Sequence, residues 1–546
     1  MPAPYRKVIA ALLPLLSAQW QTIGRSVRVG TIAFAALLTF TFALNSCRNA
    51  TDDVLDAGTV PTTRLIFESI DRTDSLSTKV RLQWSGSVKD GYITGYKIYW
   101  AYNAAPDPNA ALATVSQITS GVDSTFLFSL RGSAGGTVHF YVQALDNRGR
   151  AGVPAYLQIK VKNFSPKAQI PSSSLPVASD VFSVLTFAVA TNDPDGAETI
   201  DSLFVRVNDG RWFPINPRAS LVSLVANDPS TTNTTNTAAK VYSTVETTSI
   251  ISRLESGLAS GLRVGDSNRV YVRCKDIAGA FSNIDSSSRR IFVRRKTSDL
   301  LVIDSWNGAA PNADAINAGL LGAVYPNGYD KIDLYQNNNA YQPIQPRLWK
   351  VNFGLILQQY AKVFWYSDVS NHIINNVADP NSALIQTAAP ALKDYLDNNG
   401  RLLVSCRNYI IPDGTPNTKS YPNGSQITRI LSIDTIFNND LNVRMQSNVS
   451  LLPAAGSGYP TLKLYNGLVT GFMPFANLSD ASVLYTGPMT RSGSPYANNL
   501  VAIRRQNAFT GKTNLVFFGI DFHLFSGDAA AQQAVLDRVL NQEFNW

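Results

Sequence analysis

Hydrophobic and polar residues alternate with a period of two in short runs across residues 62–163. Val80, Leu82 and Trp84 alternate with polar residues in the first clear run. The same alternation recurs at Tyr96, Ile98 and Trp100, and again at Val138, Phe140, Val142 and Ala144. Runs of this length, separated by turn residues, predict an antiparallel β-sandwich.

Residues 166–296 repeat this plan. Leu185, Phe187 and Val189 correspond to the first run, and an Asp-Gly pair follows at the same interval in both copies. Matched positions that keep their order predict an internal repeat, and therefore a second sandwich. Within the repeat, Cys274 stands where the first copy has an inward-facing alanine. We therefore expect the Cys274 thiol to be buried as a small hydrophobic group.

The pattern changes after Lys296. Continuous apolar runs, typical of parallel strands that are buried on both faces, occur at Leu300–Asp304, Lys362–Tyr366, Arg401–Ser405 and Asn514–Phe518. Helical patterns occur at residues 389–398, which end near Gly400, and at residues 529–540. This alternation predicts a doubly wound α/β domain over residues 297–546.

Residues 412–493 interrupt the α/β pattern and are predicted to form an insert. They are rich in Gly, Pro, Asn and Tyr, and they contain only short strand-like pieces. Loops of this kind at the carboxyl ends of strands are where ligands bind. The sequence leaves open whether the insert's tyrosines, Tyr421, Tyr459 and Tyr465, stack on sugars or pack the loop.

Near the N-terminus, Arg25 and Arg28 precede an uncharged apolar run over residues 29–44. The run has the length of a signal-peptide core and is shorter than the roughly 20 residues of a membrane-spanning helix. It leads into Leu44-Asn45-Ser46-Cys47, which resembles the lipobox of bacterial lipoproteins. The resemblance implies diacylglycerol on the Cys47 thiol, cleavage before this residue, and acylation of the new amino terminus.

The lipobox divides this region into a signal peptide over residues 1–46 and a polar tether over residues 47–61. Acyl chains anchor a protein because each buried methylene contributes about 0.8 kcal/mol. We therefore expect a cell-envelope protein held by lipid on a membrane, the outer membrane in particular, and facing the periplasm or the cell surface. A plain membrane anchor with an incidental cysteine is the alternative.

Two further resemblances concern the folded part. The Trp84 strand, Asp90-Gly91, Gly95–Tyr99 and Tyr141–Ala144 resemble a fibronectin type III domain and the wider immunoglobulin-like group. The C-terminal segments 392–405 and 518–523 resemble the class I glutamine amidotransferase-like fold, a flavodoxin-like arrangement, in forms found in secreted bacterial proteins.

The second resemblance implies a catalytic pair, Cys406 as nucleophile and His523 as base. A nucleophilic cysteine needs a base within hydrogen-bond reach and a sharp turn that exposes its sulfur. Ser405 and Arg407 flank Cys406 without a glycine to permit that turn. The Pro-Glu that follows the histidine in the family is also absent. We therefore predict a degenerate site, with a thiol-dependent hydrolase or amidotransferase as the alternative.

Charge and composition exclude several other functions. The net charge of +8 suggests nucleic acid, but four of these charges, on Arg6, Lys7, Arg25 and Arg28, lie in the signal peptide. The remainder is dispersed, so no nucleic-acid partner is expected. No metal or cofactor motif occurs. The segment Asn192–Gly196 fits a turn better than a calcium site. His139 is expected to face outward from its strand, and His372 lies in a polar stretch.

Together these patterns predict a multidomain, non-enzymatic lipoprotein. Two β-sandwich domains of the fibronectin type III/immunoglobulin-like kind would form a stalk that presents a degenerate amidotransferase-like domain. The expected partners are the membrane, through the lipid, and a protein or glycan ligand on the C-terminal domain. A structural role in a larger envelope assembly is a third interpretation.

Cys47→Ala should abolish lipidation, because the diacylglycerol group is transferred to a thiol. Cells fed a radiolabelled fatty acid should label the wild-type chain and leave the variant unlabelled. Cys274→Ala is the control and should label like the wild type. Undiminished labelling of the Cys47→Ala chain would refute lipidation at this residue.

Overall fold

The computed structural model describes residues 59–66, 78–107, 112, 118–128, 135–175, 180–232, 236–246, 250–306, 313–334, 349–367, 372–374, 377–379, 384–407, 409, 427–437 and 442–546. The chain divides into two compact units, the first comprising most of the residues before 161 and the second containing residues 161–546. The predicted signal peptide, Cys47 and most of the tether lie outside the described residues. Across the described ranges, no helix is long and apolar enough to cross a membrane.

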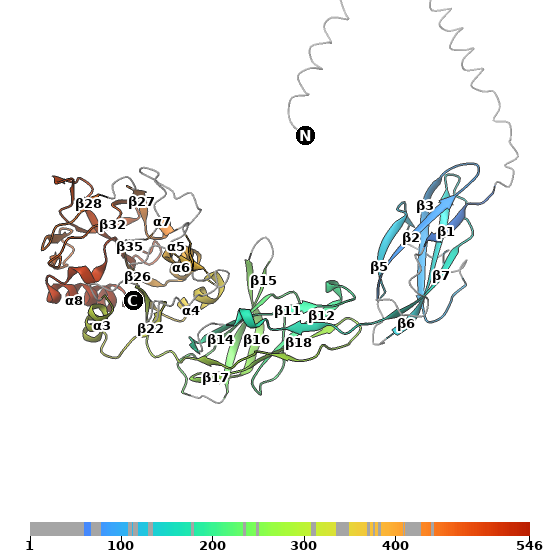
Figure 1. Ribbon diagram of the computed structural model, residues 1–546, viewed down its shortest axis with the longest axis horizontal. Helices are drawn as coiled ribbons and strands as arrows, with labels where there is room; N and C mark the ends of the chain where they lie inside the picture. Colours follow the sequence, from blue (N-terminus) through green and yellow to red (C-terminus); the bar gives the residue numbers. More distant parts are fainter. Residues whose placement is uncertain are drawn as a thin grey trace, which may run out of the picture. The chain divides into compact units, whose positions relative to one another are not determined.

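The first β-domain consists of two antiparallel sheets, with strand orders β1-β2-β5 and β4-β3-β6-β7 (Figure 1). The strands are β1 (Thr62–Ile66), β2 (Lys79–Ser87), β3 (Ile93–Tyr102), β4 (Ile118–Thr119), β5 (Asp123–Leu127), β6 (Gly135–Asp146) and β7 (Ala155–Lys162). Trp84 of β2 is buried and contacts the rings of Tyr96 and Phe126. The alternating pattern therefore produces the expected sandwich-like core.

The prediction that His139 faces solvent is wrong. Only 7% of this residue is exposed, because Tyr156 on the neighbouring strand covers it. The Tyr156 hydroxyl lies 2.8 Å from Nδ1 of His139, and the two rings are stacked. An aromatic residue on the next strand has turned an outward position into a buried one.

The second β-domain pairs two four-stranded antiparallel sheets, with orders β10-β14-β15-β16 and β13-β12-β18-β19. Their strands are β10 (Val184–Ala188), β12 (Ile200–Val207), β13 (Phe213–Ile215), β14 (Leu221–Ala226), β15 (Thr237–Glu246), β16 (Ile250–Leu262), β18 (Val270–Asp276) and β19 (Asp285–Ser286). Smaller strands complete it: β8 (Lys167–Gln169), β9 (Asp180–Val181), β11 (Ala190–Asn192), β17 (Asp266–Asn268) and β20 (Ile291–Val293). Cys274 is fully buried in its core, as expected.

The C-terminal region is built on a nine-stranded sheet of order β22-β21-β23-β26-β36-β35-β32-β29-β30. Its strands are β21 (Leu300–Ser305), β22 (Asp330–Asp333), β23 (Lys362–Ser367), β26 (Arg401–Cys406), β29 (Ser450–Pro453), β30 (Leu462–Lys463), β32 (Ala481–Thr486), β35 (Leu500–Gln506) and β36 (Thr513–Phe518). The first five in the sheet order are parallel, and the other four are antiparallel to their neighbours. Each continuous apolar run therefore forms a parallel strand, as predicted.

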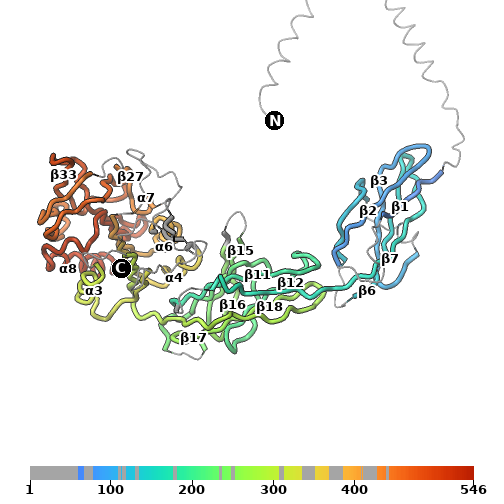
Figure 2. The backbone as a smooth tube through the Cα atoms, in the orientation of Figure 1, coloured from blue at the N-terminus to red at the C-terminus, as the bar shows by residue number. Residues whose placement is uncertain are grey.

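Helices cover both faces of this sheet. They are α3 (Ala313–Val324), α4 (Gly354–Leu357), α5 (Leu384–Thr387), α6 (Ala389–Asp397), α7 (Ile427–Ile430) and α8 (Ala529–Asp537), with short π-helical segments η3 (Trp349–Phe353) and η6 (Arg538–Glu543). The predicted helices α6 and α8 are confirmed, and α6 ends shortly before Gly400. Helices α3 and α8 pack together on one face (Figure 2).

Residues 412–493 do more than decorate this core. Strands β29, β30 and β32 all fall within this segment, and they extend the main sheet beyond β35. The segment also contains the short strands β27 (Ile433–Ile436), β28 (Val443–Arg444), β31 (Phe475–Asn477) and β33 (Thr490–Arg491), and β34 (Ser494–Pro495) directly follows it. Strands β24 (His372–Ile374) and β25 (Val377–Asp379) form a separate ribbon before it. The segment is therefore partly continuous with the sheet and partly a set of small ribbons.

The second β-domain shares a hydrophobic core with the C-terminal region. Phe182 belongs to the same buried cluster as Phe353 and Tyr360, and its ring centroid lies 6.3 Å from that of Tyr360. The guanidinium of Arg294 covers the Phe182 ring at 4.4 Å. Residues 161–546 accordingly form one compact unit.

Phe182→Ala should lower the free energy of unfolding of this unit by about 3–5 kcal/mol, because it removes a buried aromatic ring and leaves a cavity. Urea unfolding monitored by tryptophan fluorescence measures the change. Phe509→Ala is the matched control, since Phe509 is 98% exposed and its ring contributes little to the core. Equal stability of the two variants would show that the Phe182 contact does not support the unit.

Candidate functional site

The carboxyl ends of the parallel strands form the candidate site. Strand β22 lies on one side of β21 and β23 lies on the other, so the chain reverses its direction across the sheet at β21. Ligands of open α/β sheets bind in the crevice beside such a reversal. The strand ends at this edge supply Asp304, Ser367 and Cys406, and His523 follows β36.

Side-chain alternation decides which face of the sheet each of these residues occupies. On β26, Leu402, Val404 and Cys406 join the cluster that contains α4 and α6, whereas Leu403 joins the cluster that contains α3 and α8. Ser405 shares the face of Leu403, and its hydroxyl oxygen accepts a 2.6 Å hydrogen bond from the backbone N–H of Phe522. The side chains of Ser405 and Cys406 therefore point to opposite faces of the sheet.

Cys406 lies in the hydrophobic interior on the α6 face. It is fully buried, takes part in no disulfide, and shares its cluster with Tyr409 and Phe517. Burial raises the pKa of the Tyr409 hydroxyl, and the nearby Cys406 adds to this shift. Cys406 ends a regular strand and has no positive φ, so the sharp turn of an exposed nucleophile is not present at this residue.

His523 lies on the opposite face, in the short helix η5 (Phe522–Phe525). Its ring contacts Trp306 edge to face, with centroids 4.6 Å apart, and Trp306 belongs to the cluster of α3 and α8. The hydrophobic neighbours of Cys406 and the ring that His523 contacts thus belong to different clusters. The imidazole is 2% exposed, and burial with the nearby Arg407 cation lowers its pKa to about 4.

Two ion pairs flank this histidine at the same edge. The Asp304 carboxylate pairs with the Lys331 ammonium at 2.5 Å, and Asp521 pairs with the Arg407 guanidinium at 2.9 Å. Both carboxylates are almost fully buried, whereas both cations are partly exposed. Burial raises the pKa of Asp304, and its pairing with Lys331 opposes that effect. The edge is thus polar but close to neutral overall.

Asn317 adds a second polar group on the face of His523. It lies one turn inside α3, a helix that packs against η5, and it is 1% exposed. Neither its amide oxygen nor its amide nitrogen has a hydrogen-bond partner among the described residues, and the same holds for Nε2 of His523. Buried polar groups are rarely left unsatisfied in folded proteins. Asn317 and His523 therefore hold unused hydrogen-bonding capacity on this face, in the hydrophobic interior.

The other residues that the sequence suggested have structural roles where they are described. Tyr459 is buried, contacts the ring of Tyr485, and lies under the guanidinium of Arg538 at 4.6 Å. Tyr465 is partly buried against the same cluster. These contacts favour packing over sugar stacking, while Tyr421 lies outside the described residues.

The Asn192–Gly196 segment is organised as a turn. One oxygen of the Asp193 carboxylate accepts from the backbone N–H of Asp195, and the other accepts from the Thr199 hydroxyl at 2.6 Å. Gly196 has a φ of 117°. In the part of the chain that the structure describes, no cluster of His, Cys, Asp or Glu side chains is arranged to hold a metal ion.

Sequence reasoning missed Asn317 and Trp306. Trp306 directly follows the first apolar run, so its place at a strand's carboxyl end was a usable signal. The sequence signal for Asn317 was weaker, because it consists only of an amide side chain among the apolar positions of a helix. Only the fold shows that this amide is buried, in a helix that packs against η5.

His523→Gln should remove a pH-dependent loss of stability. The native pKa of His523 lies near 4, below the ordinary value of about 6.5. Unfolded chains therefore bind the proton first as the pH falls, and the stability present above pH 6.5 declines by about 3 kcal/mol towards pH 4. Glutamine does not titrate, so the variant does not lose this stability. The free energy of unfolding of the wild type minus that of the variant, measured with urea, should therefore fall by about 3 kcal/mol between pH 6.5 and pH 4. If this difference in the free energy of unfolding did not change with pH, the His523 imidazole would not be buried in its neutral form.

Comparisons with known proteins assign no family. No protein-family model and no curated protein matches the sequence. Among solved structures, the fibronectin(III)-like modules of Clostridium thermocellum CbhA match at 13% identity, covering 43% of this chain and 94% of that one, with a TM-score of 0.14. The FN1–FN3 domains of chicken CNTN1 match at 10% identity, covering 44% and 99%, with a TM-score of 0.13. At these scores the matches support neither a family nor an activity for this chain.

Proposed function

We propose that this protein is an exported lipoprotein that binds a ligand without catalysing a reaction. The lipid on Cys47 anchors it in the cell envelope, on the outer membrane. Two β-sandwich domains of the fibronectin type III/immunoglobulin-like kind carry a doubly wound α/β domain related to the class I glutamine amidotransferases. A protein or glycan ligand binds at the carboxyl edge of the parallel strands.

The strand order supports the fold part of this proposal. Five parallel strands, with helices on both faces and a reversal at β21, follow the flavodoxin-like plan that the sequence resemblance implies. The antiparallel strands β35, β32, β29 and β30 enlarge the sheet on one side. The fold itself assigns no activity, which has to be argued from the site.

The enclosure of Cys406 in the hydrophobic interior is the observation that carries the non-catalytic role. A thiol attacks only when a base removes its proton within hydrogen-bond reach. Cys406 is surrounded by hydrophobic neighbours on the α6 face, whereas the His523 ring packs on Trp306 of the other cluster. A neutral imidazole beside Trp306 instead offers one ring nitrogen for hydrogen bonding.

The unsatisfied groups support binding at this edge. Asn317 offers a carbonyl oxygen and an amide nitrogen, and His523 offers Nε2, from one side of the sheet. Trp306 supplies an aromatic surface next to them. Neutral donors and acceptors beside an aromatic ring suit a polar, uncharged group of a ligand.

Alkylation of the native full-length chain with iodoacetamide tests the non-catalytic role. We expect Cys406 to react as slowly as Cys274, since both thiols are buried, and both to react fully after denaturation. Mass spectrometry of the cysteine peptides measures the rates, and Cys274 is the internal control. Rapid alkylation of Cys406 that is lost in His523→Gln would overturn this proposal in favour of a thiol enzyme.

A further inference from the structure

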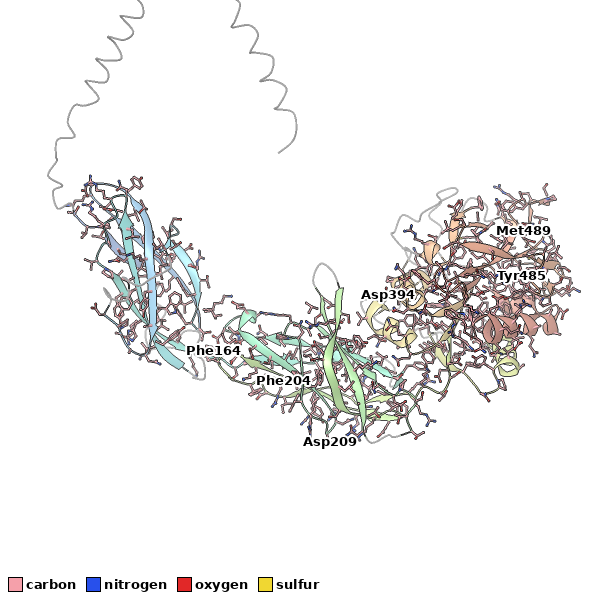
Figure 3. All side chains as sticks on the ribbon, turned by 180° about the vertical axis from the view of Figure 1, so that it is seen from behind. Phe164, Phe204, Asp209, Asp394, Tyr485 and Met489 are labelled. Atoms are coloured by element: carbon pink, nitrogen blue, oxygen red, sulfur yellow. The ribbon has the colours of Figure 1, made fainter. Side chains whose placement is uncertain are left out.

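Cationic and aromatic side chains alternate on the outward face of the second β-domain. On β18 the outward positions are Tyr271, Arg273 and Lys275, and on the neighbouring β12 they include Phe204 and Arg206. The strand register places a ring opposite a cation in each of two pairs, Phe204 with Arg273 and Arg206 with Tyr271. Figure 3 labels Phe204 among the side chains of this domain.

Stacking joins these residues into one cation–π strip, defined as Phe204, Arg206, Trp212, Tyr271, Arg273, Lys275 and Phe281. The guanidinium carbon of Arg273 lies 4.4, 4.6 and 5.5 Å from three ring centroids, those of Trp212, Phe281 and Phe204. That of Arg206 lies 4.8 and 4.5 Å from the centroids of Trp212 and Tyr271. From Tyr271 to Lys275 the strip extends about 13 Å along the strand.

The positive charges of the strip are not balanced. Arg206, Arg273 and Lys275, with the adjacent Arg269, make no ion pair and no side-chain hydrogen bond within the described ranges. Each exposed cation–π contact contributes only about 0.5–1 kcal/mol, and crowding like charges opposes it. A purely structural stack would gain from interleaved carboxylates. Because no carboxylate of the described residues lies among these four cations, we expect a bound ligand to supply the negative charge.

Stacking also prepares these cations for an anion. The guanidinium carbons of Arg206 and Arg273 lie over aromatic rings, and their Nε atoms are buried. The terminal N–H groups are therefore the donors that a ligand would meet. A planar guanidinium held in this way offers paired donors that match a carboxylate or sulfate group. Trp212 and Phe281 present aromatic surface beside these donors, and Phe281 is 45% exposed.

The strip ends at an open hollow of about 530 Å³. Phe281 belongs to both features, and the hollow is also lined by Lys167, Gln169, Asn283, Ile284 and Asp285. A ligand that follows the strip therefore meets another cation, two amides, an exposed apolar side chain, and the Asp285 carboxylate, which already accepts a hydrogen bond from the backbone N–H of Ile170. This combination of hydroxyl-binding amides, charge and apolar surface fits an acidic sugar chain.

The position of the strip argues against a peptide ligand. Extended peptides gain affinity by pairing their backbone with a free sheet edge. The strip lies on the face of the sheet, and the backbones of β12 and β18 are already paired with each other. A sugar chain needs no backbone partner, because its hydroxyl, carboxylate and C–H groups bind to side chains alone.

From these observations we infer that the outward face of β12 and β18, with its adjoining hollow, is a binding site for an acidic polysaccharide. The site lies outside the α/β domain, so it is independent of the ligand proposed for the sheet's carboxyl edge. Carboxylated and sulfated sugars present the same paired acceptor oxygens, and the experiment below separates them.

Biolayer interferometry of the immobilised full-length chain tests the inference with four probes: polygalacturonate, dextran sulfate, neutral dextran and poly-L-glutamate. Binding is expected for one or both acidic polysaccharides, should weaken with salt, and should be absent for neutral dextran. Arg273→Gln should weaken it about tenfold, because paired charge-assisted hydrogen bonds are lost. Lys275→Gln should weaken it less, since it removes a charge at the end of the strip.

Arg253→Gln is the matched control, as it makes the same charge change on an exposed residue of the opposite sheet. It should bind like the wild type, and all three variants should keep the wild-type melting temperature. If Arg273→Gln alone melts early, Lys275→Gln decides the outcome. Absence of polysaccharide binding, equal losses in the Arg253→Gln control, or equally strong binding of poly-L-glutamate would each overturn the inference.

Discussion

The central strands of the C-terminal sheet are buried on both faces, and this constraint assigns every side chain on them to one side or the other. Successive residues of a strand point in opposite directions, so a shift of one position exchanges the two environments. Ser405 therefore meets the backbone of η5, whereas Cys406 enters the hydrophobic interior. This alternation, more than the type of any one residue, determines which side chains at the sheet's edge are polar contacts and which are enclosed in the interior.

The same burial forces polar groups near the strand ends to find partners. The Trp365 indole donates to the hydroxyl of Ser305 at 2.9 Å, and Gln532 donates to the carbonyl of Phe522 at 2.7 Å. Such pairs offset the cost of removing these groups from water. Within the described ranges, Nε2 of His523 and the side-chain amide of Asn317 have no such partner.

Much of the fold could be predicted from periodicity, because alternation and continuous apolar runs follow directly from which faces are buried. The strands at Leu300, Lys362 and Arg401 begin where the pattern places them. Contacts between distant residues were harder to predict. The sequence resemblance paired Cys406 with His523, and only the fold shows that the thiol is enclosed in a hydrophobic cluster and that the imidazole packs on Trp306. Lipidation of Cys47 stays a prediction from the sequence.

Most residues of the cation–π strip occupy outward positions of β12 and β18, and outward residues of a strand are usually interpreted as solvated. The distinguishing property of the strip is an imbalance: aromatic rings and cations alternate without acids. The two binding surfaces consequently differ in character. Screening by salt weakens an interaction with the strip, whereas neutral hydrogen bonds at the sheet's carboxyl edge depend on it little.

The core shared through Phe182 has a consequence for how this protein can be divided. A fragment that begins after Lys296 would leave Phe353 and Tyr360 without their covering side chains and would expose an apolar surface to water. Such a fragment would tend to aggregate, and the second β-domain alone would carry the complementary exposed patch. The second β-domain and the C-terminal region therefore have to be produced as one piece for either to keep its core covered.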